Sequence, residues 1–211
     1  MDSIDRAELL RILAQKSFRL QETRLSAGGS SGYYIDCRTT TLSGRGGRLA
    51  GTAILDLIRI KHLSPRAVGG MTLGADPVVS NVTAASAWQA VDASAATVLD
   101  GFLVRKEKKA HGAGRQIEGF CAPDAPVVIV DDACTTGTSL IAAIRAAQEA
   151  GMRVAGVICL VEREEAGGRP GVEAAALGAP FFSVFRAQEV HDEYFASLSR
   201  DCESTGMESG N

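Results

Sequence analysis

The sequence predicts an α/β fold in which helices cover both faces of a central, mostly parallel sheet. Apolar stretches of strand length alternate with amphipathic stretches of helix length along most of the 211 residues. The central apolar stretches, 126–132 and 153–163, are nearly continuous, which is typical of strands that are buried on both faces. No long linker interrupts the pattern, so we expect a single domain over residues 1–200.

The N-terminal half contains three expected helices and two expected strands. Residues 1–15 carry apolar side chains at helical spacing, and residues 75–90 follow the same trend although Val and Thr lower their helix propensity. Helices are expected at 1–15, 47–60 and 75–90, and strands at 31–38 and 66–71.

The C-terminal half continues the alternation. Residues 101–119 predict two short strands that are joined by a charged loop, and Gly151 is expected to close the helix that precedes it. Further strands are expected at 126–132, 153–163 and 180–187, and helices at 138–151, 171–178 and 189–200. Residues 201–211 are expected to form a polar, disordered tail.

Composition excludes several classes of protein. The formal net charge of −3 argues against a nucleic-acid partner, because such proteins usually carry a basic excess. The five cysteines include no C-x-x-C pair, which argues against a disulfide framework or a zinc site and favours a reducing cytoplasm. No signal peptide is expected in the charged N-terminal stretch, and no window is apolar enough to cross a membrane.

The stretch VVIVDDACTTGTSL, residues 127–140, carries the clearest chemical signal. Asp131 and Asp132 lie at the carboxyl end of an apolar strand, where open parallel sheets bind ligands. The small and hydroxylic residues that follow open a helix, whose free N–H groups suit a phosphate. The two carboxylates suit neutral hydroxyls or a hard cation, so the pattern favours a sugar phosphate. The alternative is a helix N-cap at Thr136 or Thr138 that follows two solvated acids.

This stretch resembles the phosphoribosyl-pyrophosphate (PRPP) motif of the type I phosphoribosyltransferases. The resemblance implies the fold of that family, with a small N-terminal hood formed by about residues 1–40. It also implies that Asp131 and Asp132 face the ribose hydroxyls and that the next seven residues hold the 5-phosphate. These seven are Ala133, Cys134, Thr135, Thr136, Gly137, Thr138 and Ser139.

A second stretch, RKEKKAHG at 105–112, gathers four cations. A solvated charged hairpin is the commoner fate of such a run. The stretch is similar, however, to the R-K-x-x-K-x-H-G catalytic loop of the orotate phosphoribosyltransferases. That resemblance implies PRPP-binding roles for Arg105, Lys106, Lys109 and His111, and a catalytic role for Lys109.

Two further segments resemble the orotate branch of the family. SSGYYIDCR, at 30–38, places Tyr34 and Ile35 on the base-contacting pair, and LVEREEAGG, at 160–168, places Arg163 where a guanidinium clasps the orotate carboxylate. Thr135 is the fourth implied orotate contact. The alternative for Arg163 is a surface ion pair with Glu162 or Glu165.

The resemblance also assigns a pyrophosphate loop to GGMTLGADP, residues 69–77. Thr72 and Leu73 are its implied PRPP contacts. Leu73 and Ser26 each stand where some members of the family carry Lys, so phosphate contacts through these two side chains are not expected.

The implied reaction converts orotate and PRPP into orotidine 5-monophosphate and pyrophosphate. The resemblance implies Mg²⁺ held mainly by PRPP, with Asp131 and Asp132 as candidate additional ligands, and a homodimer whose loop 105–116 reaches the neighbouring site. A phosphoribosyltransferase for another base and a PRPP-sensing regulatory protein of the same fold are the alternatives. Cys134 has no nearby base that would make it a nucleophile, but alkylation there is expected to block the phosphate loop.

Overall fold

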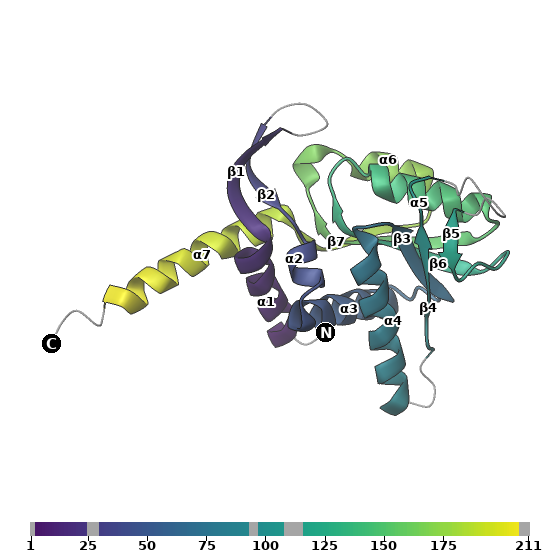
Figure 1. The fold of residues 1–211 in the computed structure, drawn as a ribbon, viewed down its shortest axis with the longest axis horizontal. Coiled ribbons are helices and arrows are strands. Elements are labelled where there is room, and N and C mark those ends of the chain that lie inside the picture. The colour runs from purple at the N-terminus through teal and green to yellow at the C-terminus, as the bar shows by residue number, and fades with distance from the viewer. Residues whose placement is uncertain (1–2, 25–29, 93–96, 108–115, 207–211) are drawn as a thin grey trace.

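The computed structural model describes residues 3–24, 30–92, 97–107 and 116–206 (Figure 1). Within these ranges six strands form one sheet in the order β5-β4-β3-β6-β7-β8, and two further strands form an antiparallel hairpin, β1-β2. All neighbours in the larger sheet are parallel except β4 and β5. The strands are β1 (Phe18–Arg24), β2 (Ser30–Ile35), β3 (Ala67–Met71), β4 (Asp100–Val104), β5 (Ile117–Gly119), β6 (Pro126–Cys134), β7 (Arg153–Glu162) and β8 (Phe181–Arg186).

Helices cover both faces of this sheet. The α-helices are α1 (Ser3–Ile12), α2 (Arg38–Thr41), α3 (Gly44–Ile60), α4 (Ala75–Asp92), α5 (Thr138–Glu149), α6 (Arg169–Ala175) and α7 (Ala187–Gly206). A π-helical turn, η1 (Leu13–Ser17), follows α1, and a 3-10 turn, η2 (Glu164–Ala166), follows β7. None of the helices in the described ranges is both long and apolar enough to traverse a bilayer.

Alternation along β6 builds two cores, one on each side of the sheet. Ile129 faces a cluster that it shares with Leu140 of α5, whereas Val130 faces a cluster that it shares with Ile54 of α3 and Val82 of α4. All of these side chains are essentially inaccessible to water. The predicted α/β fold with a central, mostly parallel sheet is therefore confirmed.

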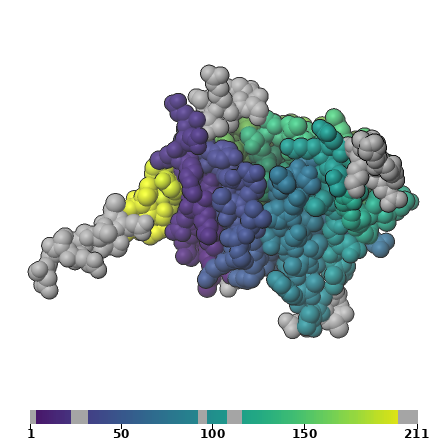
Figure 2. Space-filling model, viewed as in Figure 1, coloured from purple at the N-terminus to yellow at the C-terminus, as the bar shows by residue number. Residues whose placement is uncertain are grey.

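A third cluster joins the two ends of the chain. Leu9 and Leu13 of the first helical segment pack with Phe18, with Phe185 of β8 and with Val190 of α7. Figure 2 shows the purple N-terminal segment beside the yellow C-terminal helix, and Figure 1 shows β1 and β2 rising next to both. This cluster fixes the hairpin relative to the edge of the sheet at which β7 and β8 end.

Several boundaries differ from those expected. The first helix ends at Ile12, and β1 was missed because Phe18 is its anchor in the core whereas the residues after it, such as Leu20, are exposed. Helix α7 continues to Gly206, past the tail boundary predicted at Asp201, because no Gly or Pro interrupts it before that residue. Residues 207–211 of the predicted tail lie outside the described residues.

Candidate active site

A cleft of about 310 Å³ opens at the carboxyl ends of β3 and β6. It brings together residues that are far apart in the sequence, from the hairpin, from the loop after β3, from the end of β4 and from the β6–α5 junction. Its walls are formed by Tyr34, Ile35, Asp36, Cys37, Arg38, Met71, Thr72, Leu73, Gly74, Lys106, Asp131, Asp132, Ala133, Thr135 and Ser139. Ten of the sequence-predicted PRPP or orotate contacts are thus within the described part of this wall, together with Arg38 and Asp36, which were not predicted.

Asp131 and Asp132 form the floor of the cleft. Asp131 is 4% exposed, and its Oδ1 accepts a hydrogen bond from the backbone N–H of Asp132 at 3.0 Å. Burial and the neighbouring charge of Asp132 raise the pKa of Asp131 well above its ordinary value. Burial also raises the pKa of Asp132, although the charge of Arg38 opposes that change. A buried acid beside a partly buried one is stabilised by hydroxyl donors or by a cation.

The phosphate loop follows these acids and leads into α5. Gly137 is the N-cap residue of α5 and has a φ of 76°, a left-handed conformation that glycine adopts without steric cost. Thr136 Oγ1 and Thr138 Oγ1 lie 2.9 Å apart. Thr135 and Ser139 border the cleft, whereas Thr136, Gly137 and Thr138 are not part of its described wall.

The loop after β7 supports the phosphate loop from behind. A Cβ atom on Gly168 would lie 2.3 Å from the carbonyl oxygen of Thr135 and 2.8 Å from the backbone nitrogen of Gly137. These are backbone atoms that cannot rotate away, so only glycine allows the two loops to pack this closely.

The loop between β3 and α4 forms the opposite wall. Thr72 donates its backbone N–H to the carbonyl of Val104 at 3.0 Å, and the Thr72–Leu73 peptide bond is cis. The Leu73 side chain is 69% exposed at the mouth of the cleft. The loop to which the resemblance assigns pyrophosphate therefore lines the same cleft as the two acids.

Arg105 and Lys106, the cations in the described part of the loop, make different contacts. Lys106 borders the cleft, whereas Arg105 forms an ion pair with Glu118, with 2.9 Å between Nε and Oε1. Arg105 thus pairs with a residue of the adjoining strand β5. Lys109 and His111 lie outside the described residues.

The hairpin and α2 close the cleft from the side. Ile35 is buried and Tyr34 is 39% exposed, and both contribute to the wall. Asp36 holds Arg38 through two contacts, Nε–Oδ1 at 2.8 Å and Nη2–Oδ2 at 2.9 Å, and this hydrogen bonding lowers the pKa of Asp36. Arg38 is a cation that sequence reasoning missed, although it ends the quoted segment SSGYYIDCR.

Arg163 lies at the same end of the sheet but does not form part of the described wall. Its backbone N–H is bonded to the carbonyl of Cys134 at 2.8 Å, and its side chain is buried. Nε and Nη2 both donate to Glu165 Oε1 at 3.1 Å. One of the two ion pairs considered as alternatives is therefore present.

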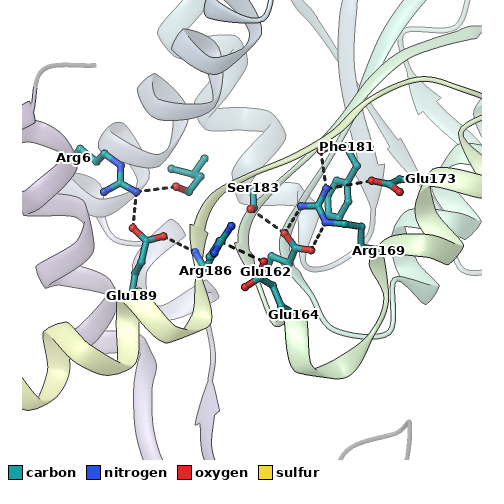
Figure 3. Close-up of polar contacts among 10 residues, drawn as sticks. Arg6, Glu162, Glu164, Arg169, Glu173, Phe181, Ser183, Arg186 and Glu189 are labelled. Atoms are coloured by element: carbon teal, nitrogen blue, oxygen red, sulfur yellow. Dashed lines mark hydrogen bonds and ion pairs between the residues drawn. The ribbon is translucent and has the colours of Figure 1, made fainter.

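Glu162, the other alternative partner, binds elsewhere. Figure 3 shows its buried carboxylate held by Arg169 and Ser183, with Arg169 Nη2–Oε2 at 2.5 Å, Nε–Oε1 at 2.8 Å and Ser183 Oγ–Oε2 at 3.0 Å. The neighbouring Glu164 pairs with Arg186 at 3.3 Å. This network fixes the end of β7, from which the loop carrying Arg163 departs.

Comparison with known proteins agrees with this geometry. Residues 103–173 match the family model described as phosphoribosyl transferase domain. An orotate phosphoribosyltransferase from Aquifex aeolicus is 37% identical over 190 residues, which cover 89% of this chain and 98% of the relative. Another from Streptomyces coelicolor is 37% identical over 185 residues, 88% of this chain and 96% of the relative. The chain belongs to the orotate phosphoribosyltransferase family.

Solved structures of this family have the same fold. The Mycobacterium tuberculosis orotate phosphoribosyltransferase in complex with Fe(III) dicitrate has a TM-score of 0.73 at 35% identity, covering 88% of this chain and 98% of that one. The M. tuberculosis enzyme in complex with PRPP has a TM-score of 0.69 at 30% identity, covering 90% and 93% of the two chains.

The side chain of Cys134 is not part of the described cleft wall, although the resemblance assigns its backbone to the phosphate loop. Cys134 is the last residue of β6, and its side chain is 1% exposed within the core cluster of Leu140. A hydrogen bond from Cys159 lowers the pKa of the Cys134 thiol. The expected block of the phosphate loop by alkylation is therefore not supported by its position.

The donor atoms in the cleft fit a magnesium ion that is held mainly by substrate. Carboxylate oxygens are the ligands that Mg²⁺ prefers, and Asp131 and Asp132 supply them. Among the residues that the structure describes, no group of three or more His, Cys, Asp or Glu side chains could form a complete metal cage. A magnesium ion here would take its remaining ligands from phosphate, ribose or water.

Proposed function

We propose that this chain catalyses the transfer of the 5-phosphoribosyl group of PRPP to orotate, giving orotidine 5-monophosphate and pyrophosphate. The observation that carries this proposal is one cleft, in a member of the orotate phosphoribosyltransferase family. It is lined by the acid pair, by the residues that follow the pair and by the hairpin residues Tyr34 and Ile35. We place the reaction in cytoplasmic pyrimidine synthesis, and the free cysteines of the described ranges agree with a reducing compartment.

PRPP is proposed to lie across the floor of the cleft. Asp131 and Asp132 accept hydrogen bonds from the ribose hydroxyls, and the backbone of the phosphate loop, 133–139, donates to the 5-phosphate. Thr72 and Leu73 bind pyrophosphate through their backbone, because Leu73 offers no cation. Lys106 adds a positive charge from the end of β4.

Catalysis in this proposal is mainly a matter of charge placement. The bond between the anomeric carbon and pyrophosphate breaks with its electron pair leaving on pyrophosphate, while a bond to the orotate ring nitrogen forms and that nitrogen releases its proton to solvent. Negative charge therefore accumulates on pyrophosphate. Lys106 and Lys109 neutralise that charge, and closure of the loop excludes water that would otherwise hydrolyse PRPP. Magnesium, when bound, supplies further positive charge to the pyrophosphate oxygens.

Orotate is proposed to lie between the hairpin and the end of β7. Tyr34 and Ile35 contact the ring, Thr135 contacts its polar edge, and Arg163 binds its carboxylate. A guanidinium matches a carboxylate with two parallel hydrogen bonds, and uracil and the purines lack that group. Arg163 therefore distinguishes orotate from the bases of the alternative phosphoribosyltransferases.

We further propose a homodimer in which loop 105–116 of one subunit covers the active site of its partner. The family resemblance supports this arrangement. In such a dimer Arg105, Lys109 and His111 would serve the neighbouring site, whereas Asp131 and Asp132 would serve their own.

The direct test is a spectrophotometric assay of orotate consumption with PRPP and magnesium, with the product identified by mass spectrometry. Formation of orotidine 5-monophosphate by the wild-type chain, and its loss on Asp131→Asn with Asp132→Asn, would support the proposal. Uracil, adenine and hypoxanthine serve as matched alternative acceptors. Turnover of one of these bases in preference to orotate, or PRPP binding without any transfer, would overturn it.

A further inference from the structure

Tyr33 of the hairpin lies against the side chain that is proposed to bind orotate. The centre of the Arg163 guanidinium is 4.6 Å from the centroid of the Tyr33 ring, a cation–π distance. Tyr33 and Arg163 are 130 residues apart in the sequence, and their contact joins β2 to the loop after β7. Tyr34, the next residue, is part of the cleft wall.

One carboxylate oxygen connects the two side chains. Glu165 Oε1 accepts the Tyr33 hydroxyl at 2.6 Å, and it also accepts Nε and Nη2 of Arg163 at 3.1 Å each. Burial and the hydrogen bond to Glu165 raise the pKa of Tyr33 to about 12, so the hydroxyl stays protonated and donates throughout the neutral range. Burial alone would raise the pKa of Glu165, but the hydrogen bond from Tyr33 and the charge of Arg163 lower it on balance.

The Tyr33 ring is itself held in place. Phe18 stacks on it with a centroid distance of 5.2 Å and an interplanar angle of 22°, and His191 of α7 lies 5.9 Å away. Phe18 in turn packs on Tyr194 at 4.6 Å. The aromatic cluster therefore supports one side of the Tyr33 ring while Arg163 contacts it as well.

We propose that Tyr33 and Glu165 are positioning residues, which hold the Arg163 guanidinium in a fixed plane and thereby determine how tightly the carboxylate of the base is bound. A two-bond contact between a guanidinium and a carboxylate requires the two planes to coincide, and a long side chain that is free to rotate loses affinity by ordering. The inference rests on the proposed role of Arg163 and adds the two side chains that act through it.

A role in which Glu165 competes with orotate for Arg163 predicts a different result. If its carboxylate instead occupied the place of orotate, its removal would free Arg163 and tighten orotate binding. The three-way contact favours positioning, because the Tyr33 hydroxyl also holds Oε1 and would resist its displacement. The sign of the change in the KM for orotate on Glu165→Gln decides between these roles.

The experiment compares Tyr33→Phe, Glu165→Gln and the double variant with wild type, with both substrates varied in steady state. Loss of one hydrogen bond predicts a rise of roughly three- to tenfold in the KM for orotate in each single variant. The KM for PRPP and the melting temperature should stay close to wild type. Because both changes remove the same connection, the double variant should be little worse than the more affected single variant.

Two further variants make the outcome decisive. Tyr194→Phe removes a hydroxyl from the same aromatic cluster without contacting Arg163, so its KM for orotate should equal that of wild type. Arg163→Ala tests the underlying assignment: an unchanged KM for orotate would refute the proposed role of Arg163 itself. The positioning role is overturned if Arg163→Ala raises the KM for orotate while Tyr33→Phe and Glu165→Gln leave it unchanged or lower it. It is also overturned if all KM values and the melting temperature shift together.

Discussion

Replacement of Asp131 by Asn should make the protein more stable and less active. The side chain is 4% exposed, and burial together with the charge of Asp132 disfavours its ionised form. Asn has nearly the same shape, and its carbonyl oxygen can still accept the hydrogen bond that Asp131 Oδ1 receives from the Asp132 backbone at 3.0 Å. The substitution thus removes a disfavoured charge without removing the contact.

The raised pKa gives the sign of the effect, and single substitutions usually change stability by about 0.5–3 kcal/mol. A gain of about 1–2 kcal/mol would raise the melting temperature by roughly 2–8 °C in a chain of this length. Activity should move the other way, with kcat/KM for PRPP reduced about 10- to 100-fold, because hydrogen bonds from the ribose to a charged group are stronger than those to a neutral amide.

The pH dependence of stability tests the same prediction in a second way. Between the ordinary Asp pKa of about 3.9 and its raised native value, the native state binds more protons than the unfolded state. The stability of the ligand-free wild type should therefore fall as the pH rises through this window, and Asp131→Asn should flatten that slope. Calorimetric melting curves at a series of pH values measure both effects.

Asp36 provides a matched control with the opposite sign. It also borders the cleft, but its pKa is lowered by Arg38, so its charge stabilises the native state above the unfolded pKa and that contribution is lost as the pH falls through the native pKa. Asp36→Asn should lower stability at neutral pH, by at most about 1 kcal/mol because the pair is partly exposed. A fall of several degrees in the melting temperature of Asp131→Asn, equal to or larger than that of Asp36→Asn, would refute the reasoning and make the acid structural.

Three other predictions test the phosphate loop, the core thiol and the dimer. Gly168→Ala should lower activity at least tenfold and stability by about 1–3 kcal/mol, because its Cβ meets backbone of the phosphate loop; kinetics and melting curves would contradict this if both match wild type. Iodoacetamide should modify exposed Cys121 before buried Cys134 in the native protein, as peptide mass spectrometry would show, and early loss of the Cys134 thiol would contradict its burial. Subunit exchange between inactive Lys109→Ala and Asp131→Asn/Asp132→Asn dimers should restore activity, and an inactive mixture with heterodimers verified by native mass spectrometry would refute the shared site.

The parts of the fold that sequence could predict are those with a local signal. Continuous apolar runs such as 127–130 identify strands buried on both faces, and their carboxyl ends must meet at one edge of a parallel sheet. The acid pair, Thr72 and Lys106 could therefore be expected around one cleft although they lie on different strands or loops. The hairpin strand β1 gave no such signal, because Phe18, the one buried residue among 18–22, packs against segments distant in the sequence.

The orientation of Cys134 shows a different limit. Strict alternation from Ile129, which faces the α5 side of the sheet, would place Cys134 on the α3 side with Val130. The structure places Cys134 on the α5 side instead. The alternation therefore slips by one residue across the acid pair, and nothing in the residue types marks that slip.

The partners of Arg163 were also beyond local reasoning. Glu162, Glu164 and Glu165 flank this residue in sequence, so any of them could have bound it. The choice is made by segments that are far away: Arg169 and Ser183 take Glu162, Arg186 takes Glu164, and the hairpin presents a tyrosine hydroxyl to Glu165.

The acid pair explains why this end of the sheet is suited to a ligand that carries several hydroxyls and phosphates. Asp131 and Asp132 lie side by side near the end of β6, where burial disfavours the charge of both and the charge of Asp132 further disfavours that of Asp131. Arg38, which could offset them, is already held by Asp36 through two contacts. The groups that best satisfy the pair are therefore those that a ligand brings: hydroxyl donors on adjacent carbons, with a cation carried by its phosphates. In the proposed complex the ribose hydroxyls would compensate this charge, so the two carboxylates that lower stability in the free site would favour a ribose with both hydroxyls free.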